Sequence, residues 1–390
     1  MTPGRDAPPA TRDADHRRDL RTSLLLALAT FAVAFALATA RLGHGAPDFY
    51  VFWAAAGHWQ APYDPAVITR LQAVIHLGGT WPFAYPPSFL LMVWPFTLAP
   101  LTLAYPLWAG LTGAAFVFTA SRLIRPAWGA AALLAAPPVF FSAMLGQTTL
   151  PIGAAMLGGW LVIDRRPALA GVLFALAACI KPQAMILAPV VLWGRWRTLA
   201  WMAGAGAAIV AASLVFGFER WLEWPRALAS FRQIAPQADR ANPSALIDGP
   251  WWSAATALGG GLFAWRNRNL LGMVGGAFLA TPYAHAYDLA PLAPLAATWV
   301  FEFRRYGWGQ AGAGACLLGG VIATPLAALA FFGAVALLTW TGGRWSGERP
   351  LNPSRVPLSL WGRRRDGAAP EFSSPLGGGR PRSGGGGAAA

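Results

Sequence analysis

Apolar stretches fill this chain from residue 22 to residue 341, and clusters of arginine separate them. Hydrophobic residues make up 56% of the 390 residues and charged residues only 12%, against about 25% charge in a soluble domain. A single water-soluble core could not bury so much apolar surface. The sequence therefore predicts an all-α polytopic membrane protein.

The net charge of +14 does not indicate a nucleic-acid-binding protein. The basic residues form no stripe or patch, and they lie between apolar runs as topology signals do. The two cysteines, Cys179 and Cys316, both lie inside apolar stretches. This spacing excludes a disulfide framework and a cysteine-based metal cluster.

The two ends of the chain have a different composition from its middle. Residues 1–21 are polar and rich in Pro and Ala, and we expect a disordered cytoplasmic tail there. Residues 342–390 are rich in Gly, Pro, Arg and Ser, which predicts a second, low-complexity tail. The predicted transmembrane domain is 22–341, with large outer loops at 41–85 and 218–252.

Residues 22–40 form an apolar run of 19 uncharged residues behind a basic flank. Ala38-Thr39-Ala40 resembles a signal-peptidase site, but the run is longer than the apolar part of a typical signal peptide. We therefore favour an uncleaved first helix. The arginines before it place the N-terminus in the cytoplasm, so the chain after residue 41 is expected outside.

Each later arginine cluster is expected to mark a cytoplasmic turn. The apolar stretch between two clusters has a polar break near its middle, which this scheme places on the outer side. The breaks are Gly146-Gln147, Lys181-Pro182, residues 218–252, Thr281-Pro282-Tyr283 and Thr324-Pro325. The pattern predicts about 9–12 membrane helices, with short outer-face helices.

Several of these segments are short. Residues 168–180 give about 20 Å of helix, against a hydrocarbon core of about 30 Å. The alternative is one helix over 168–193, which would hold Lys181 near the bilayer centre at a cost of at least about 2.5–3.5 kcal/mol. We favour a hairpin with its turn at Lys181. Residues 86–97 are expected to form a re-entrant or interfacial helix, followed by one full span.

Asp48 is a carboxylate among aromatic and apolar residues, directly after the first predicted helix. Desolvation at a membrane surface raises the pKa of such a carboxyl group, which suits a general base. The alternative is an Asp that caps a short interfacial helix.

Lys181 is the only lysine of the chain, beside 29 arginines. An ammonium group is a compact point charge that binds phosphate, and Gln183 follows two residues later. The alternative is a lysine at a helix end whose amine reaches the membrane surface.

Two further segments carry polar groups at membrane depth. Gln147 with the hydroxyls of Thr148 and Thr149 suits sugar hydroxyls, or backbone groups freed at a helix break. His285 and Asp288 share a helix face, so an Asp could orient a His that binds an anionic leaving group. A structural His–Asp hydrogen bond between helices is the alternative.

The outer stretch 218–252 carries four arginines, against the positive-inside trend. Arg220 and Arg226 are candidates for binding an anionic lipid head group. A solvated loop paired with its own acidic residues accounts for them equally well. The many tryptophans of the outer loops are interpreted as an interfacial belt, or as a stacking surface for sugars or a lipid chain.

Four stretches in this order resemble the family 87 glycosyltransferases, polytopic enzymes of the C-type glycosyltransferase fold. They are Asp48-Phe49 with Tyr63-Asp64-Pro65, residues 84–91, residues 146–150 with 170–183, and residues 281–289. The resemblance covers roughly 45–300. Thr148-Thr149 stands where many relatives carry Asn after the Gln.

The resemblance implies an inverting transfer of a sugar, mannose in part of the family, from a polyprenyl-phosphate sugar to a lipid or glycan acceptor. It implies no metal and no cofactor, and a site on the outer face of the bacterial inner membrane. The family's acidic base falls on Asp48, its KPQ-type turn on Lys181-Pro182-Gln183, and its Pro-Tyr-x-His segment on Pro282 to His285.

The resemblance and the residue chemistry together give this set of candidate site residues. The catalytic candidates are Asp48 and His285; the donor-phosphate ligands are Lys181, Arg220 and Arg226; the substrate-binding residues are Tyr85, Gln147, Gln183, Tyr283 and Asp288. The rival interpretations are a secondary transporter or lipid flippase with broken helices, and a non-catalytic membrane scaffold.

Overall fold

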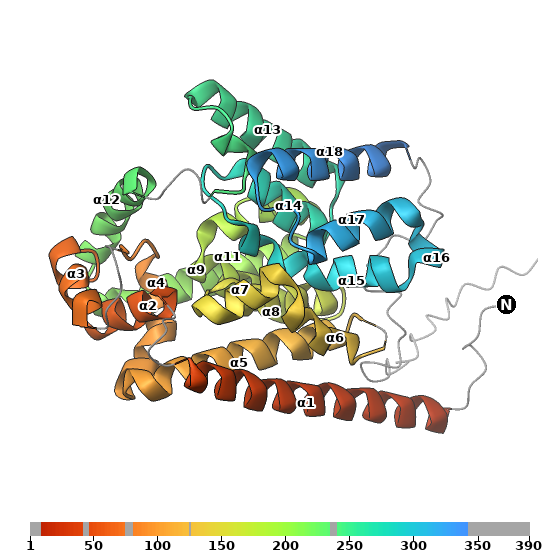
Figure 1. Ribbon diagram of the computed structural model, residues 1–390, viewed down its shortest axis with the longest axis horizontal. Coiled ribbons are helices and arrows are strands. Elements are labelled where there is room, and N and C mark those ends of the chain that lie inside the picture. The colour runs from red at the N-terminus through yellow and green to blue at the C-terminus, as the bar shows by residue number, and fades with distance from the viewer. Residues whose placement is uncertain (1–8, 42–46, 75–80, 125, 235–239, 342–390) are drawn as a thin grey trace, which may run out of the picture.

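The computed structural model describes residues 9–41, 47–74, 81–124, 126–234 and 240–341, and within these ranges the chain forms helices and no strand (Figure 1). This agrees with the predicted all-α class. The expected tail over 342–390 and the first residues of the N-terminal tail lie outside the described residues.

The first helix and the first full span pack along each other in opposite directions. They are α1 (Pro9–Ala40) and α5 (Leu101–Ser121). Arg122, directly after α5, donates a hydrogen bond to Ser23 near the start of the apolar part of α1. Helix α1 begins at Pro9, so the structure corrects the expectation of a disordered tail over residues 9–21.

Short helices fill the first predicted outer loop and the segment after it. They are α2 (Pro47–Gly57), α3 (Pro65–Val74), α4 (Pro87–Val93) and the 3-10 helix η1 (Trp94–Leu98). Helix α4 with η1 is the separate short helix expected near 86–97. Pro87 opens α4 at its first turn, where a missing N–H costs no hydrogen bond.

The middle of the chain forms the hairpins that the sequence predicts. Helix α7 (Pro137–Leu145) ends at Gly146, and α8 (Thr149–Val162) follows it. Helix α9 (Pro167–Ile180) packs back along α8 and ends before Lys181, where Pro182 starts the 3-10 helix η3 (Pro182–Met185). A single long helix over 168–193 is therefore not formed.

The second half adds paired helices around this centre. Helix α11 packs on α9, α13 on α14, and α15 on α17. The remaining bounds are α10 (Ala188–Val191), α11 (Trp196–Ser213), α12 (Glu219–Ile234), α13 (Pro250–Arg266), α14 (Leu270–Ala280), α15 (Ala293–Phe301), α16 (Phe303–Tyr306), α17 (Trp308–Leu318) and α18 (Pro325–Thr341). Short helical turns join them: α6 (Gly129–Ala132), η2 (Leu133–Ala135), η4 (Leu214–Phe216), η6 (Pro243–Ala245) and η7 (Ala286–Leu292).

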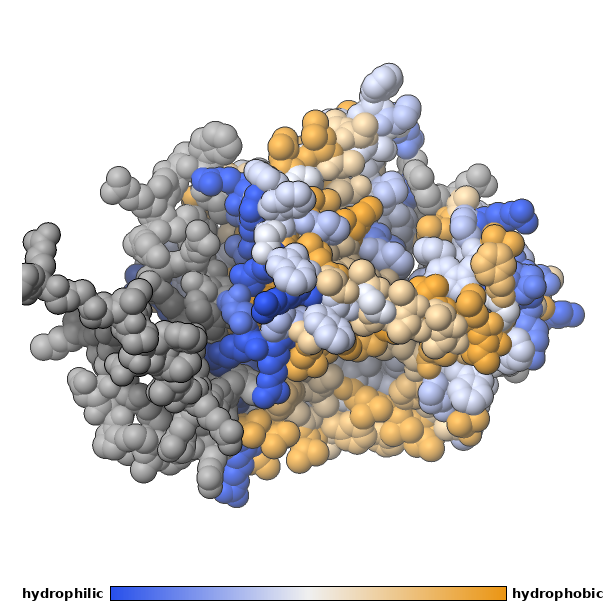
Figure 2. Space-filling view, turned by 180° about the vertical axis from the view of Figure 1, so that it is seen from behind, coloured by the Kyte–Doolittle hydropathy of each residue, from blue (hydrophilic) through white to orange (hydrophobic). Residues whose placement is uncertain are grey.

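Among the residues that the structure describes, three helices are long and apolar enough to cross a membrane: Asp19–Ala40, Leu101–Ser121 and Trp196–Phe216. Only 17% of the first window and 11% of the third are buried inside the protein, so most of their apolar surface faces outward. Figure 2 shows apolar residues gathered across the middle of one face, with hydrophilic residues toward both ends. This surface fits a helical protein embedded in lipid.

Arginine-bearing turns gather at one end of the helices. Arg122 meets Ser23 there, and Arg195 forms an ion pair with Asp164 at 2.9 Å, which joins the turn after α8 to the turn before α11. Thr119, near the end of α5, lies beside Gly158 of α8. Helices α2, α3 and α12 lie at the opposite end (Figure 1).

Candidate functional site

An ion pair between two distant parts of the chain forms the centre of the site. Lys181 follows the last residue of α9, and Asp288 lies in η7. The Lys181 Nζ and an Asp288 Oδ atom are 2.5 Å apart, with side-chain exposures of 11% and 14%. Both residues are site candidates from the sequence, and in the structure their charges are in direct contact.

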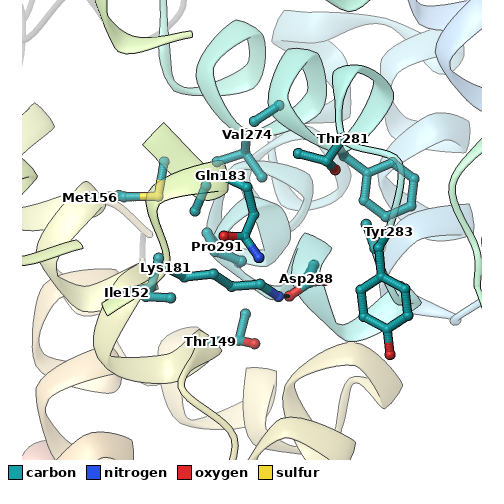
Figure 3. A pocket seen from close by; sticks show the side chains of 14 residues that line it. Thr149, Ile152, Met156, Lys181, Gln183, Val274, Thr281, Tyr283, Asp288 and Pro291 are labelled. Atoms are coloured by element: carbon teal, nitrogen blue, oxygen red, sulfur yellow. Dashed lines mark hydrogen bonds and ion pairs between the residues drawn. The ribbon is translucent and has the colours of Figure 1, made fainter. Parts of the chain in front are cut away.

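A pocket opens beside this ion pair. In Figure 3 the Lys181 side chain extends toward Asp288, with Thr149 below the pair and Gln183 above it. Apolar side chains of α8 and α14 form another wall. The lining residues are Thr149, Ile152, Met156, Lys181, Gln183, Ala184, Val274, Ala277, Phe278, Thr281, Tyr283, Ala284, Asp288 and Pro291. One pocket thus offers a cation, a carboxylate, polar side chains and an apolar surface.

Thr149 is a lining residue with a distinctive hydroxyl group. Its side chain is 2% exposed, and its Oγ1 atom has no hydrogen-bond partner within the described part of the chain. A buried polar group without a partner is costly, and a bound ligand would satisfy it.

Asp48 lies in the first turn of α2, half-buried, within electrostatic reach of Lys181 and Asp288. Burial raises the pKa of this carboxyl from 3.8 to about 6, and the Asp288 carboxylate adds to the rise. A hydrogen bond from the Gln147 side chain and the charge of Lys181 lower the pKa in part. A carboxylate with this pKa is ionised at neutral pH and still basic enough to accept a proton.

Aromatic hydroxyls and an amide join Asp48 to the pocket. The Tyr85 Oη lies 3.3 Å from both Gln147 Oε1 and Thr148 Oγ1, and Gln147 Nε2 donates to Tyr287 Oη at 3.1 Å. Tyr85 precedes α4, Gln147 lies between α7 and α8, and Tyr287 lies in η7. Three of the elements around the site are therefore connected at this one amide.

His285 lies at the start of η7, and protein groups engage both of its ring nitrogens. Nε2 is 2.5 Å from Tyr283 Oη, and the imidazole accepts the backbone N–H of Asp288. Asp288 Oδ2 in turn accepts the backbone N–H of His285 at 3.0 Å. Asp288 therefore orients His285 through its backbone, while its other oxygen contacts Lys181.

The outer-loop arginines are placed differently from one another. Arg220 pairs with Glu223 at 2.6 Å within α12, and Arg226 is exposed on the same helix. Neither contacts the pocket within the described part of the chain. Arg240 is buried, at 9% exposure, with its guanidinium 5.5 Å from the centre of the Tyr283 ring.

The position of Arg240 follows from the segment that carries it. The Ala241 N–H donates to the Ala284 carbonyl, and the buried Asn242 side chain bonds to the backbone of Thr281 and Ala284. The segment is thus attached to the 281–284 turn. Sequence reasoning counted Arg240 among the four outer arginines but did not single it out, because no local pattern shows where this segment docks.

Within the described ranges no three His, Cys, Asp or Glu side chains group together as a metal site would require. The chemical groups available at the site are two carboxylates, one ammonium, one guanidinium, one imidazole, and several hydroxyls and amides. This arrangement suits a reaction in which a proton is removed at Asp48 and an anion is held at Lys181.

The fold and the site define an all-helical membrane protein whose pocket has polar and apolar walls and lies at the end of the helices opposite the arginine-bearing turns. The sequence model of glycosyltransferase family 87 matches residues 83–301, more than half of the chain, so the chain belongs to this family and is a glycosyltransferase. A search of curated proteins and a search of solved structures each gave no match. The predicted resemblance is confirmed, which favours the enzyme over the transporter, flippase and scaffold.

Proposed function

We propose that this protein transfers a sugar, mannose in the first instance, from a polyprenyl-phosphate sugar to a lipid or glycan acceptor. The transfer takes place at the outer face of the bacterial inner membrane, with inversion and without a metal or other cofactor. One observation carries the proposal: Asp48 lies within electrostatic reach of the Lys181–Asp288 pair, beside a pocket with polar and apolar walls.

The pocket chemistry supports a lipid-linked phosphate as the donor. The Lys181 ammonium attracts a phosphoryl oxygen, and the Thr149 hydroxyl, which has no partner among the described residues, can donate to another. The apolar wall formed by Ile152, Met156 and Val274 suits the hydrocarbon next to the phosphate. A nucleotide-sugar donor would have no use for this apolar wall.

The reaction can be written with the residues present. The acceptor hydroxyl gives its proton to the Asp48 carboxylate as its oxygen forms a bond to the anomeric carbon. The bond between that carbon and the donor phosphate oxygen breaks on the opposite side, which inverts the configuration. The leaving lipid phosphate takes the bonding electrons and gains one negative charge.

Cations around the phosphate stabilise this developing charge. Lys181 exchanges its contact with Asp288 for a contact with the phosphate, and Asp288 keeps the His285 backbone in place. The Tyr283–His285 pair lies at the same pocket, so a proton on either group can be shared with a phosphate oxygen. Arg240, held over the Tyr283 ring, adds a second cation.

A transfer assay with purified protein in lipid vesicles tests the function. Radiolabelled polyprenyl-phosphate mannose is supplied with a bacterial envelope extract, and labelled product is measured for the wild type and for Asp48→Asn. We expect product with the wild type only. A labelled nucleotide sugar is the control donor.

Three results would change the proposal. Transfer by Asp48→Asn at the wild-type rate would remove Asp48 as the base. Transfer from the nucleotide sugar alone would replace the donor class. Transfer of a polyprenyl-phosphate pentose in place of mannose would correct the sugar.

A further inference from the structure

Gln147 has an unusual environment for a residue expected to bind substrate. Its side chain is buried, at 4% exposure. Its Oε1 atom is 3.3 Å from the Tyr85 hydroxyl and 3.3 Å from the Thr148 backbone N–H, which both point donors at it. Its Nε2 atom donates to the Tyr287 hydroxyl at 3.1 Å, and the same side chain bonds to Asp48.

The number of bonds matches the capacity of the group. A carboxamide has two acceptor positions on oxygen and two N–H donors on nitrogen. The two donors at Oε1 occupy the oxygen, so the bond to the Asp48 carboxylate, which only accepts when ionised, uses the second N–H. With all four positions filled, the amide has none left for a sugar hydroxyl.

We infer that Gln147 is a positioning residue that holds the Asp48 carboxylate in the orientation needed to receive the acceptor proton. The inference rests on the proposed function, and it replaces the expected contact between Gln147 and substrate. Tyr85 and Tyr287 fix the amide from two sides, so the bond to Asp48 has a defined direction. Asp48 supplies the chemistry, and Gln147 acts through it.

Backbone packing next to the two residues supports the same conclusion. Gly146 has a φ of +65°, and a Cβ atom added there would lie 2.6 Å from the Cβ of Phe49. The absence of a side chain at 146 thus lets α2 approach the end of α7. Asp48 and Gln147 are the neighbours of these two residues, so the close backbone approach also brings the carboxyl and the amide together.

The charged and titratable groups that act on Asp48 come from three other elements. Lys181 and Gln147 favour its ionised form, whereas burial and Asp288 favour its protonated form. Tyr85 and Tyr287 also interact electrostatically with Asp48, and burial raises the pKa of both phenols further above the physiological range. Loss of the Gln147 donor therefore moves the balance toward the protonated carboxyl, and the pKa of Asp48 rises above about 6.

Two substitutions test the inference in the transfer assay. Gln147→Met keeps the length of the side chain but removes every hydrogen bond, and Gln147→Glu keeps its shape but replaces the donor with an acceptor. For Gln147→Met we expect a fall in kcat of about 10–100-fold, with the donor KM within twofold, because misplacement of a catalytic group by about 1 Å costs about 100-fold. The acidic limb of the pH profile should move upward by about one pH unit in Gln147→Met, and further in Gln147→Glu.

The matched control is Ser142→Ala in α7. The Ser142 side chain is fully buried, and its hydroxyl has no hydrogen-bond partner within the described residues. The substitution removes a buried polar atom near the helix break at Gly146 and leaves Asp48 unchanged. The transfer rate and its pH profile should therefore stay at wild-type values. Thermal melting in detergent shows whether each variant is folded. If Gln147→Met does not fold, Gln147→Glu is the variant that tests the inference.

An infrared measurement makes the test independent of turnover. The carboxylic C=O band that titrates in the wild type and disappears in Asp48→Asn belongs to Asp48, and its midpoint gives the pKa directly. The inference predicts an upward shift of this midpoint in both Gln147 variants. An unchanged midpoint, or a raised KM with an unchanged kcat, would overturn it and return Gln147 to substrate binding.

The infrared result also separates this inference from the proposed function. A shifted midpoint in a protein that transfers no sugar from a polyprenyl-phosphate donor would contradict the function and keep the link between Gln147 and Asp48. Transfer activity with an unshifted midpoint and an unshifted pH profile would support the proposed function and contradict the link between Gln147 and Asp48.

Discussion

The Lys181 ammonium lies 2.5 Å from a carboxylate oxygen of Asp288, a residue 107 positions later in the chain. The helix before Lys181 ends at Ile180, and the turn around Asp288 places the carboxylate opposite. The only lysine of the chain is therefore paired with a carboxylate. In the proposed reaction a donor phosphate competes with Asp288 for this ammonium, so substitutions of the pair test the proposed donor site.

Lys181→Met should weaken donor binding and destabilise the protein. Fully buried pairs lose about 3–5 kcal/mol when one partner is removed, and this pair is slightly exposed, so we expect a loss of about 3 kcal/mol or less. The donor KM should rise at least about tenfold, because a charged hydrogen bond contributes about 1.5–3 kcal/mol. The acceptor KM should not change.

The double variant Lys181→Met/Asp288→Asn separates the two effects. It removes both charges, so the melting temperature should recover toward the wild-type value while the donor KM stays high. Lys181→Arg keeps the charge but not the compact shape and should be intermediate. A rise in the acceptor KM in place of the donor KM would move Lys181 to the acceptor side.

Gly146→Ala should disturb both stability and activity. A non-glycine residue is strained at φ +65°, and the added methyl group would meet Phe49 at 2.6 Å. Strained backbone of this kind costs about 1–3 kcal/mol, and relief of the contact would separate Asp48 from Gln147. Thermal melting in detergent and the transfer rate measure the two consequences.

The matched substitution is Gly204→Ala in α11. A Cβ atom there meets nothing within 4 Å, and Gly204 lies inside a regular helix. Alanine is more favourable than glycine in a helix by about 0.5–1 kcal/mol, so stability should be equal or slightly higher. Equal effects of the two substitutions would show that the approach of Phe49 to Gly146 is unimportant.

The pH dependence of transfer should report the ionisation of Asp48. Its pKa of about 6 means that the carboxyl is protonated in acid and cannot accept the acceptor proton. The rate should therefore fall below about pH 6, by tenfold per pH unit. Asp48→Asn should reduce kcat by about 10²–10⁴-fold, the range for loss of a general base.

The same carboxyl should affect stability with the opposite sign. The pKa of Asp48 is about 6 in the folded protein, against the ordinary value of 3.8 that applies to the unfolded chain. The folded state therefore binds the proton more tightly. Stability contributed by this group is thus present below about pH 4 and is lost as the pH rises through 6. Asp48→Asn should raise the melting temperature at pH 7.5 by an amount equivalent to at most about 3 kcal/mol, and much less at pH 4. No pH dependence of this difference would contradict the burial of Asp48.

The sequence predicts the local breaks of this fold well. A glycine before Gln147, a proline after Lys181 and a proline after Thr281 each end a helix where the structure ends one. Such breaks are local, because proline and positive-φ glycine act on the residues next to them. The sequence did not predict the first part of α1, before residue 22, because its polar composition shows no hydrophobic periodicity.

The contacts that build the site are much harder to predict. Tyr85 meets Gln147 across 62 positions, and Gln147 meets Tyr287 across 140. These contacts between residues far apart in the sequence depend on how α2, α4, α8 and η7 pack against one another. No local sequence pattern predicts that packing. For the same reason the sequence singled out Arg220 and Arg226 and not Arg240, although it is Arg240 that lies against the Tyr283 ring.

The orientation in the membrane can be tested with single cysteines in a variant that lacks Cys179 and Cys316. Ala66 in α3 is exposed at the end where α2, α3 and α12 lie, and Trp128 is 61% exposed near the arginine-bearing turns. An impermeant maleimide should label Ala66→Cys in intact spheroplasts. It should label Trp128→Cys only after lysis. The reverse pattern would place the site in the cytoplasm.

Arg240 and Arg226 differ in burial, and this difference decides which of them should affect donor binding. Arg240 is 9% exposed beside Tyr283, whereas Arg226 lies on the outer surface of α12. A charge inside the protein interacts more strongly with a phosphate than an exposed charge, which water and salt screen. Arg240→Gln should therefore raise the donor KM at least about tenfold, the effect of losing one charged hydrogen bond of about 1.5–3 kcal/mol. Arg226→Gln should change it less than twofold, and a larger effect there would restore the α12 arginine as the phosphate ligand.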